Sequence, residues 1–303
     1  MTNTAVTKIT WRAGRLDAKV LSRFPDLQVL HASSNKLTDL EGLKGCLQLL
    51  ELNCAGNRLT TLTGLQYCPQ LRILNCMGNR LTNLGELTSC LHLQELDCSC
   101  NLIETLTGLA HTKLEHLNCS NNPLLSLEGL IGCPQLLRLY CNRCQLVSLT
   151  GLEGCAQLRR LNCSRNQLAS LLGLSCSQLR YIVCDYNKLA QLTGIEACIR
   201  LKYLVCNNNI LESLAGLESC LQLVELNCIR NLLVSIEEIR LCTRLRGLYC
   251  SRNQLASLAG IESCIDLEYL SCCMNRLTTL EPLAHLSMLY TLHCSKNPIT
   301  HDR

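Results

Sequence analysis

The sequence has very few bulky aromatic residues. Among its 303 residues there are one tryptophan, one phenylalanine and eight tyrosines. A thick globular core usually draws much of its buried area from aromatic side chains. Hydrophobic residues still make up 48% of the chain, and 25 of them are cysteines. This composition favours a thin, repetitive core of leucine and cysteine over a single spherical one.

Long hydrophobic runs are also missing. No stretch reaches the ~18 apolar residues that a membrane helix needs, so we predict no membrane span. The segment from Met1 to Trp11 is polar and alternating, without the apolar stretch and cleavage site of a secretory signal. The formal net charge of +4 is too small to indicate a polyanionic partner by itself. These features predict neither a membrane-spanning nor a secreted protein.

Self-similarity at a fixed period is the clearest feature of the sequence. The repeated unit, of 21 or 22 residues, reads L-x-x-L-x-C-x-x-N-x-L-x-x-L-x-G-L-x-x-C-x-x. Its asparagine recurs at Asn35, Asn57, Asn79, Asn101, Asn122, Asn166, Asn187, Asn209, Asn231, Asn253, Asn275 and Asn297. One further turn carries Cys144 at this position. We predict about 13 repeats over residues 27–303, preceded by an N-terminal cap with a degenerate repeat over residues 1–26.

Each column of the repeat predicts a structural role. Leu52 and Cys54 alternate with Asn53, which is strand spacing, so both side chains should point into the core. The amide of Asn57 both donates and accepts hydrogen bonds, and we expect it to bond backbone groups of the turn that leaves the strand. Gly64 belongs to a column that is glycine in nine of twelve turns, which indicates a tight backbone position. Because no single turn can bury its own leucines, the strands should stack into a parallel sheet.

Segments such as LTGLQYCPQLRILNCMGNRLTNL resemble the 22-residue class of leucine-rich repeats, as in the protein phosphatase 1 regulatory subunit and axonemal dynein light-chain adaptors. The resemblance extends from about residue 6 to residue 299. It implies an α/β repeat solenoid, a leucine-rich-repeat horseshoe with a parallel β-sheet on the concave side and short helical or irregular segments on the convex side. It also implies a cytoplasmic or nuclear protein-binding scaffold. The cysteines depart from the family, which usually has an aliphatic residue there.

The cysteines could indicate disulfides or a metal site. However, twelve fall in the inward strand column and ten in a convex column, and only Cys100, Cys144 and Cys273 fall outside both. Neighbouring strands lie ~4.8 Å apart, whereas a disulfide needs converging Cβ atoms ~3.8 Å apart. We therefore predict reduced, buried packing cysteines and a reducing compartment. Cys141 and Cys144 form a C-x-x-C without the second pair that a zinc site needs, so we expect no metal. Cys100 and Cys273 should face outward as the best candidates for modification.

The outward residues of each strand, and those that flank the asparagine column, should line the concave face. They include twelve basic residues, five acidic residues and six of the eight tyrosines. Arginine and tyrosine are enriched among the residues that anchor protein interfaces. We predict a partner-binding patch over turns six to eleven, formed by Arg138, Tyr140, Arg143, Arg160, Arg165, Tyr181, Tyr186, Tyr203, Arg230, Tyr249 and Arg252.

These observations predict a non-catalytic scaffold that binds a protein partner with an acidic surface. One alternative is a phosphatase-1-type regulatory subunit, which the repeat length favours. Another is a single-stranded nucleic-acid binder, because arginine and tyrosine hold single strands by charge and stacking. The five acidic residues on the same face make nucleic acid the weaker interpretation.

Catalytic motifs are missing from the sequence. None of the seven histidines stands in a metalloprotease or nucleophile-elbow setting, and the glycines come one per turn, without a phosphate-binding loop. His116 lies beside Asn118, with Glu95 and Asp97 one turn away, which predicts a local polar cluster. We expect no enzyme activity, cofactor or small-molecule substrate.

Overall fold

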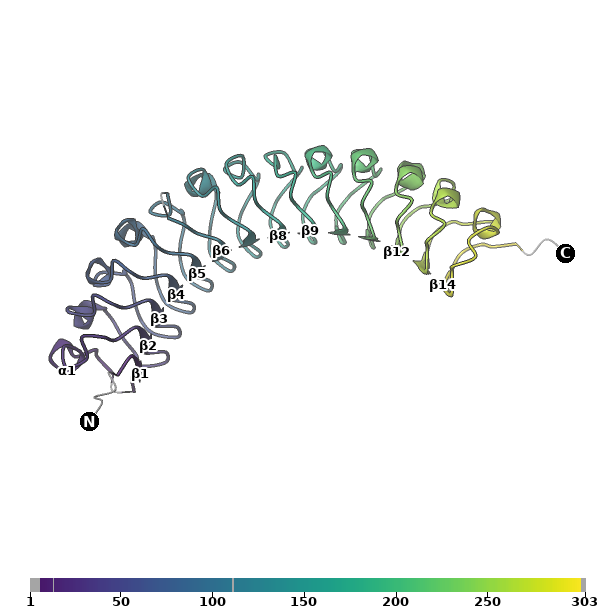
Figure 1. The fold of residues 1–303 in the computed structure, drawn as a ribbon. Helices are drawn as coiled ribbons and strands as arrows, with labels where there is room; N and C mark the ends of the chain where they lie inside the picture. The colour runs from purple at the N-terminus through teal and green to yellow at the C-terminus, as the bar shows by residue number, and fades with distance from the viewer. Residues whose placement is uncertain (1–5, 13, 111, 301–303) are drawn as a thin grey trace. The chain divides into compact units, whose positions relative to one another are not determined.

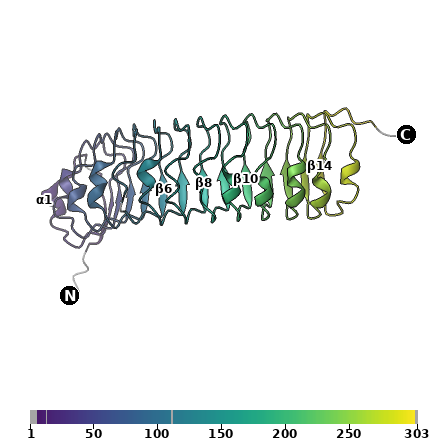
Figure 2. The same cartoon turned by 90° about the horizontal axis from the view of Figure 1, so that it is seen from above.

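The computed structural model describes residues 6–12, 14–110 and 112–300. The chain forms two compact units, unit 1 (Met1–Gln145) and unit 2 (Leu146–Arg303). In each unit, every strand pairs in parallel with the next strand along the chain. Within each unit the strands lie on one side and the short helices on the opposite side (Figures 1 and 2). The predicted α/β repeat solenoid with a parallel sheet is therefore confirmed.

Unit 1 carries seven strands among its described residues, each three residues long. They are β1 (Lys8–Thr10), β2 (Val29–His31), β3 (Glu51–Asn53), β4 (Ile73–Asn75), β5 (Glu95–Asp97), β6 (His116–Asn118) and β7 (Arg138–Tyr140). The helices are α1 (Ala18–Leu21) and the 3-10 helices η1 (Glu41–Leu43), η2 (Leu65–Tyr67), η3 (Gly85–Ser89) and η4 (Glu128–Leu130). The predicted cap, residues 1–26, contributes β1 and α1, although residues 1–5 and 13 lie outside the described part. Its boundary at residue 26 stays a prediction.

Unit 2 repeats the same plan without an α-helix in its described part. Its strands are β8 (Arg160–Asn162), β9 (Tyr181–Val183), β10 (Tyr203–Val205), β11 (Glu225–Asn227), β12 (Gly247–Tyr249), β13 (Tyr269–Ser271) and β14 (Thr291–His293). Its 3-10 helices are η5 (Ile195–Ala197), η6 (Leu217–Ser219), η7 (Glu237–Leu241), η8 (Ile261–Ser263) and η9 (Glu281–Leu283). Residues 301–303, the end of the predicted repeat region, lie outside the described residues.

Leucine and cysteine columns fill the interior of both units. On β3 and just after it, Leu52 and Cys54 are fully buried, and Asn53 between them is only half-buried, as the alternation predicts. All 25 cysteines are free, and 21 of them are buried. Burial raises the pKa of Cys163 to about 12, because the thiolate would lose its hydration. These buried thiols therefore pack as neutral, small apolar groups, which confirms the predicted packing role.

Four cysteines lie outside the fully buried set. Cys100 is exposed, as predicted, whereas Cys144 and Cys273 are half-buried. Cys273 is less exposed than Cys100, because the hydroxyl of Ser295 lies 3.4 Å from its Sγ atom and partly covers it. Cys294 belongs to the inward column, yet it is half-buried, because no described strand follows β14. The burial of a thiol column thus depends on a neighbouring turn on each side.

The asparagine column connects each turn to the one before it. Asn209 accepts a hydrogen bond from the amide of Leu189 (3.1 Å) and donates to the carbonyl oxygens of Cys184 (3.1 Å) and Cys206 (3.0 Å). One side chain thereby satisfies three buried backbone groups from two turns. The expected role of this column in bonding the turn that leaves the strand is confirmed.

Cys144 fills the asparagine position in the last turn of unit 1. Its Sγ atom lies 3.6 Å from the carbonyl oxygen of Cys119, which is the contact that an asparagine Nδ2 atom makes in the other turns. Burial raises the pKa of this thiol, and nearby backbone amides oppose the shift. A thiol is a weaker donor than an amide, so this turn is held less firmly than its neighbours.

The glycine column marks the close approach of consecutive turns. Gly64 has a φ of 116°, and a Cβ atom placed on it would overlap the carbonyl group of Leu40 in the preceding turn. Only glycine meets both conditions without strain. The predicted tight backbone position is confirmed.

Candidate partner-binding surface

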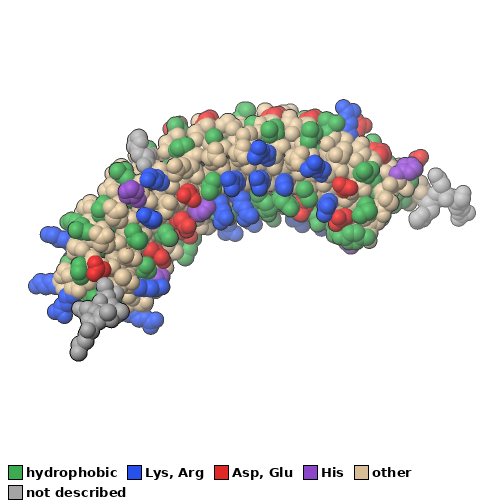
Figure 3. Space-filling view, in the orientation of Figure 1, with side chains coloured by type: hydrophobic (Ala, Val, Ile, Leu, Met, Phe, Trp, Pro, Cys, Tyr) green, Lys and Arg blue, Asp and Glu red, His purple; other side chains and the backbone are tan. Residues whose placement is uncertain are grey.

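Outward strand residues give unit 2 a face rich in tyrosine and valine. We call this face, together with the exposed arginines in the turns that leave its strands, the sheet face of unit 2. On β9 and β10, Tyr181 and Tyr203 are 38% and 37% exposed, while Ile182 and Leu204 between their outward neighbours are fully buried. Strand alternation causes this division, because successive side chains point to opposite faces. Figure 3 shows Lys and Arg side chains gathered on the strand side near β8 and β9.

Tyrosine rings contact one another across neighbouring strands of the sheet face. Tyr181 and Tyr203 are register partners, and their ring centroids lie 5.7 Å apart. Tyr249 and Tyr269 stack at 4.7 Å, although they are not register partners. Gly247 leaves room for this second pair, because the Tyr249 ring comes within 3.3 Å of the place where a Cβ atom would lie. Such contacts hold the rings in defined positions.

A row of arginines lies just beyond the ends of these strands. Arg165, Arg230 and Arg252 are exposed, and each directly precedes an asparagine of the buried column. Their backbone φ angles of 56°, 56° and 60° are left-handed. This conformation costs a residue other than glycine roughly 1–2 kcal/mol. We call these three residues the arginine row.

Further contacts fix the first arginine of the row. The Arg165 guanidinium lies over the ring of Tyr186, 4.2 Å from its centroid. Asp185 directly precedes Tyr186, and one of its carboxylate oxygens accepts a 2.6 Å hydrogen bond from the backbone amide of Asn207. Burial raises the pKa of Asp185, and the charge of Arg165 opposes that shift. Arg165 is therefore stacked on Tyr186, and the carboxylate of Asp185 lies close enough to interact with its charge.

The eleven predicted patch residues divide between the two units. Arg138, Tyr140 and Arg143 belong to unit 1, and the other eight belong to unit 2. All eleven are exposed except Tyr249, which is half-buried. Their solvent exposure agrees with the predicted division of repeat positions into inward and outward ones. Their role in binding stays a prediction.

The predicted polar cluster around His116 is present in unit 1. Glu95 and His116 are register partners, and Asn118 donates a 3.2 Å hydrogen bond to Asp97. Together with Tyr140, these side chains line a shallow, open hollow on the strands. This part of unit 1 therefore presents two carboxylates, those of Glu95 and Asp97, on the outward side of its strands.

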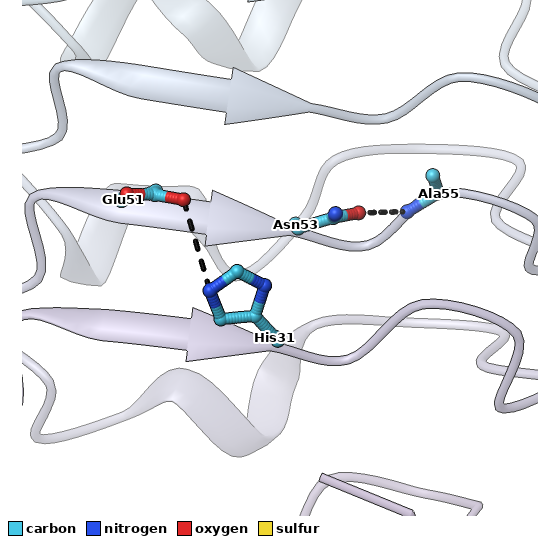
Figure 4. A network of polar contacts seen from close by, with 4 residues as sticks. All are labelled: His31, Glu51, Asn53 and Ala55. Carbon is cyan, nitrogen blue, oxygen red and sulfur yellow. Dashed lines mark hydrogen bonds and ion pairs between the residues drawn. The ribbon is translucent and has the colours of Figure 1, made fainter. Parts of the chain in front are cut away.

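Earlier strands of unit 1 carry a second polar pair. The Nε2 atom of His31 on β2 lies 3.8 Å from a carboxylate oxygen of Glu51 on β3, and Asn53 accepts a hydrogen bond from the amide of Ala55 (Figure 4). The contact is an ion pair only when the imidazole is protonated. Both side chains are about one-third exposed, so it then contributes less than about 1 kcal/mol. These contacts hold polar side chains together on neighbouring strands of unit 1.

Sequence reasoning misses the left-handed column, the stack of Arg165 on Tyr186 and the hydrogen bond accepted by Asp185. The first was detectable, because glycine and asparagine tolerate left-handed backbone better than other residues. The same column elsewhere holds Gly56, Gly78, Asn121 and Asn208. The other two features depend on side-chain rotamers, which repeat spacing does not specify.

Within the described part of the chain, no group of three or more His, Cys, Asp or Glu side chains is placed to hold a metal ion. Likewise, none of the helices found there has the length and apolar character to cross a membrane.

The repeat and its fold define a class of protein. A family model of two-copy leucine-rich repeats matches residues 25–67, 69–111, 112–154 and 243–285, which is more than half of the chain. The chain therefore belongs to the leucine-rich-repeat family. A search of curated proteins gives no matching relative.

Solved structures share the fold over nearly the whole chain. An internalin (inlF) of Listeria monocytogenes has a TM-score of 0.83 at 20% identity, covering 98% of this chain and 88% of its own. A leucine-rich-repeat protein of Leptospira interrogans has a TM-score of 0.76 at 25% identity, with coverages of 97% and 85%. The functional domain of InlJ from Listeria monocytogenes, which includes a cysteine ladder, has a TM-score of 0.65 at 25% identity, with coverages of 88% and 62%.

Proposed function

We propose that this chain is a non-catalytic scaffold that binds a protein partner with an acidic surface through the sheet face of unit 2. The observation that carries the proposal is the arginine row. Glycine or asparagine would suit its left-handed backbone better, as at Gly56 and Asn208. The recurrence of exposed arginine at three positions of this column, each in a conformation that glycine suits better, favours a role for these side chains.

The chemistry of the surface supports an acidic protein partner. Guanidinium groups bind carboxylates through two parallel hydrogen bonds, and such charge-assisted bonds are stronger than neutral ones. A stacked parallel sheet holds these side chains in place before binding, so association costs less conformational entropy. The free, buried thiols support a reducing compartment, and we place the protein in the cytoplasm or nucleus.

The test is partner capture with the triple variant R165G/R230G/R252G. Glycine relieves the left-handed strain at all three positions, so the unfolding midpoint should stay the same or rise. Capture of acidic proteins from a cell extract, measured by quantitative mass spectrometry, should fall at least tenfold. The matched control is K296G, which removes one positive charge from the same column with φ of 59° and should leave capture nearly unchanged.

Two defined ligands separate the alternatives. The phosphatase 1 catalytic subunit and a 20-nucleotide single strand are each measured directly against the full chain. Full retention of every acidic partner by the triple variant would contradict the proposed surface. Tight, salt-sensitive binding of the single strand, lost in the triple variant, would replace the proposal with nucleic-acid binding.

A further inference from the structure

We propose that the partner segment is an extended peptide with acidic residues at positions one and five and apolar residues at positions two and four, lying across β8 to β11 of unit 2. The inference rests on the proposed function and specifies the ligand of the same surface. It arises because an apolar platform on β9 and β10 lies between arginines that follow β8 and β11.

The platform consists of Tyr181, Val183, Tyr203 and Val205. The first two lie on β9 and the last two are their register partners on β10. The tyrosines are exposed, and the valines are half-buried. The neighbouring strands carry polar residues at the valine position, Asn162 on β8 and Asn227 on β11, so the apolar surface is two strands wide.

The arginine row flanks this platform on both sides. Arg165 lies in the turn that leaves β8, and Arg230 lies in the turn that leaves β11. Backbone amides continue the ladder there, since Arg165 bonds the carbonyl oxygen of Asp185 (2.7 Å) and Arg230 that of Ser251 (3.0 Å). Strand spacing therefore holds in this column. Arg165 and Arg230 follow strands that are three strand spacings apart, so the two residues are separated by about 14 Å.

An extended peptide that crosses the strands matches this arrangement. Its side chains alternate between two sides, and same-side neighbours lie ~6.8 Å apart. Acidic residues at positions one and five are then about 14 Å apart and face Arg165 and Arg230 together. The intervening residues at positions two and four point the opposite way, onto the rings of Tyr181 and Tyr203. Arg252, in the turn after the next strand, can also bind the carboxylate at position five of the peptide.

Asp185 limits how strongly an acidic ligand binds here. It follows β9, between the turn of Arg165 after β8 and the turn of Asn207 after β10. Its carboxylate there repels an incoming acidic group. An asparagine at this position keeps an oxygen for the amide of Asn207 and removes the charge. D185N should therefore increase affinity for the acidic segment, and a misfolded protein would not produce such a gain.

The experiment measures binding of fluorescein-labelled peptides to the full chain by fluorescence anisotropy. The matched segment is Glu-Leu-Ser-Leu-Glu, flanked by Gly-Ser at each end. Its controls are the rearranged Glu-Glu-Ser-Leu-Leu and the neutral Gln-Leu-Ser-Leu-Gln. We expect the matched segment to bind at least fivefold more tightly than either control. A threefold or larger gain is expected for the D185N variant.

Two variants separate this inference from the proposed function. The double variant Y181A/Y203A should weaken binding of the matched peptide at least fivefold while leaving Glu-Glu-Ser-Leu-Leu unchanged. If both acidic peptides bind equally well and both lose binding in R165G/R230G/R252G, the spacing inference is wrong and the acidic surface stands. If no acidic peptide responds to the arginine variants, both proposals are wrong.

Discussion

Replacing Asn209 by alanine should lower the free energy of unfolding of unit 2 by about 3–5 kcal/mol, because each buried backbone group left unpaired costs about 1–3 kcal/mol. The side chain serves the amide of Leu189 and the carbonyl oxygens of Cys184 and Cys206. Alanine provides none of these bonds, and water has little access, since Asn209 is only 7% exposed. Urea unfolding followed by far-ultraviolet circular dichroism measures the change.

The neighbouring Asn208 gives the matched control. It has a left-handed φ of 53° and precedes the buried column. N208G should change the unfolding free energy by less than about 1 kcal/mol, since glycine suits this conformation but gains more freedom in the unfolded chain. Equal and small effects of N209A and N208G would show that the asparagine column does not hold the turns together.

Gly194 should tolerate alanine poorly. Its φ is 104°, and an added Cβ atom would overlap the carbonyl group of Leu171. The backbone of one turn must then move away from the next, so G194A should cost about 3–5 kcal/mol, as strain and overpacking add. The measurement is again the midpoint and slope of urea unfolding.

Gly216 separates the two contributions to this cost. It has nearly the same φ, 102°, but the nearest atom to its added Cβ is a methyl group of Ile195, 3.2 Å away. G216A should therefore cost only about 1–2 kcal/mol, which is the price of the left-handed conformation. A cost for G194A no larger than for G216A would contradict the close approach of the turns.

The fold was largely predictable because one short pattern repeats. Leu52 and Cys54 identify the inward strand face, Asn57 the bonded turn and Gly64 the tight approach, and each role is confirmed. The ends and the special turns were less predictable. Membership of the inward cysteine column predicts that Cys294 is buried, but its burial also requires a neighbouring turn on each side. The short helices opposite the strands also vary from turn to turn with little change in the pattern.

The candidate surface was predictable only in part. Alternation identifies which side chains face outward, and Tyr181 and Arg230 are exposed accordingly. Repeat spacing does not specify how outward side chains contact each other. The stack of Arg165 on Tyr186 and the hydrogen bond from Asn207 to Asp185 require coordinates, because they depend on rotamers across neighbouring turns.

Both the buried columns and the outward surface depend on which positions of the repeat face the interior and which face outward. The accessibility of the cysteine thiols measures this most directly. The folded chain is treated with a maleimide, and labelled cysteines are identified over time by mass spectrometry. Cys100 should react first and the half-buried Cys144, Cys273 and Cys294 slowly, while the 21 buried cysteines stay unlabelled until urea unfolds the chain. Rapid labelling of the strand column in the folded protein, for example at Cys206, would place that column outside and contradict the account.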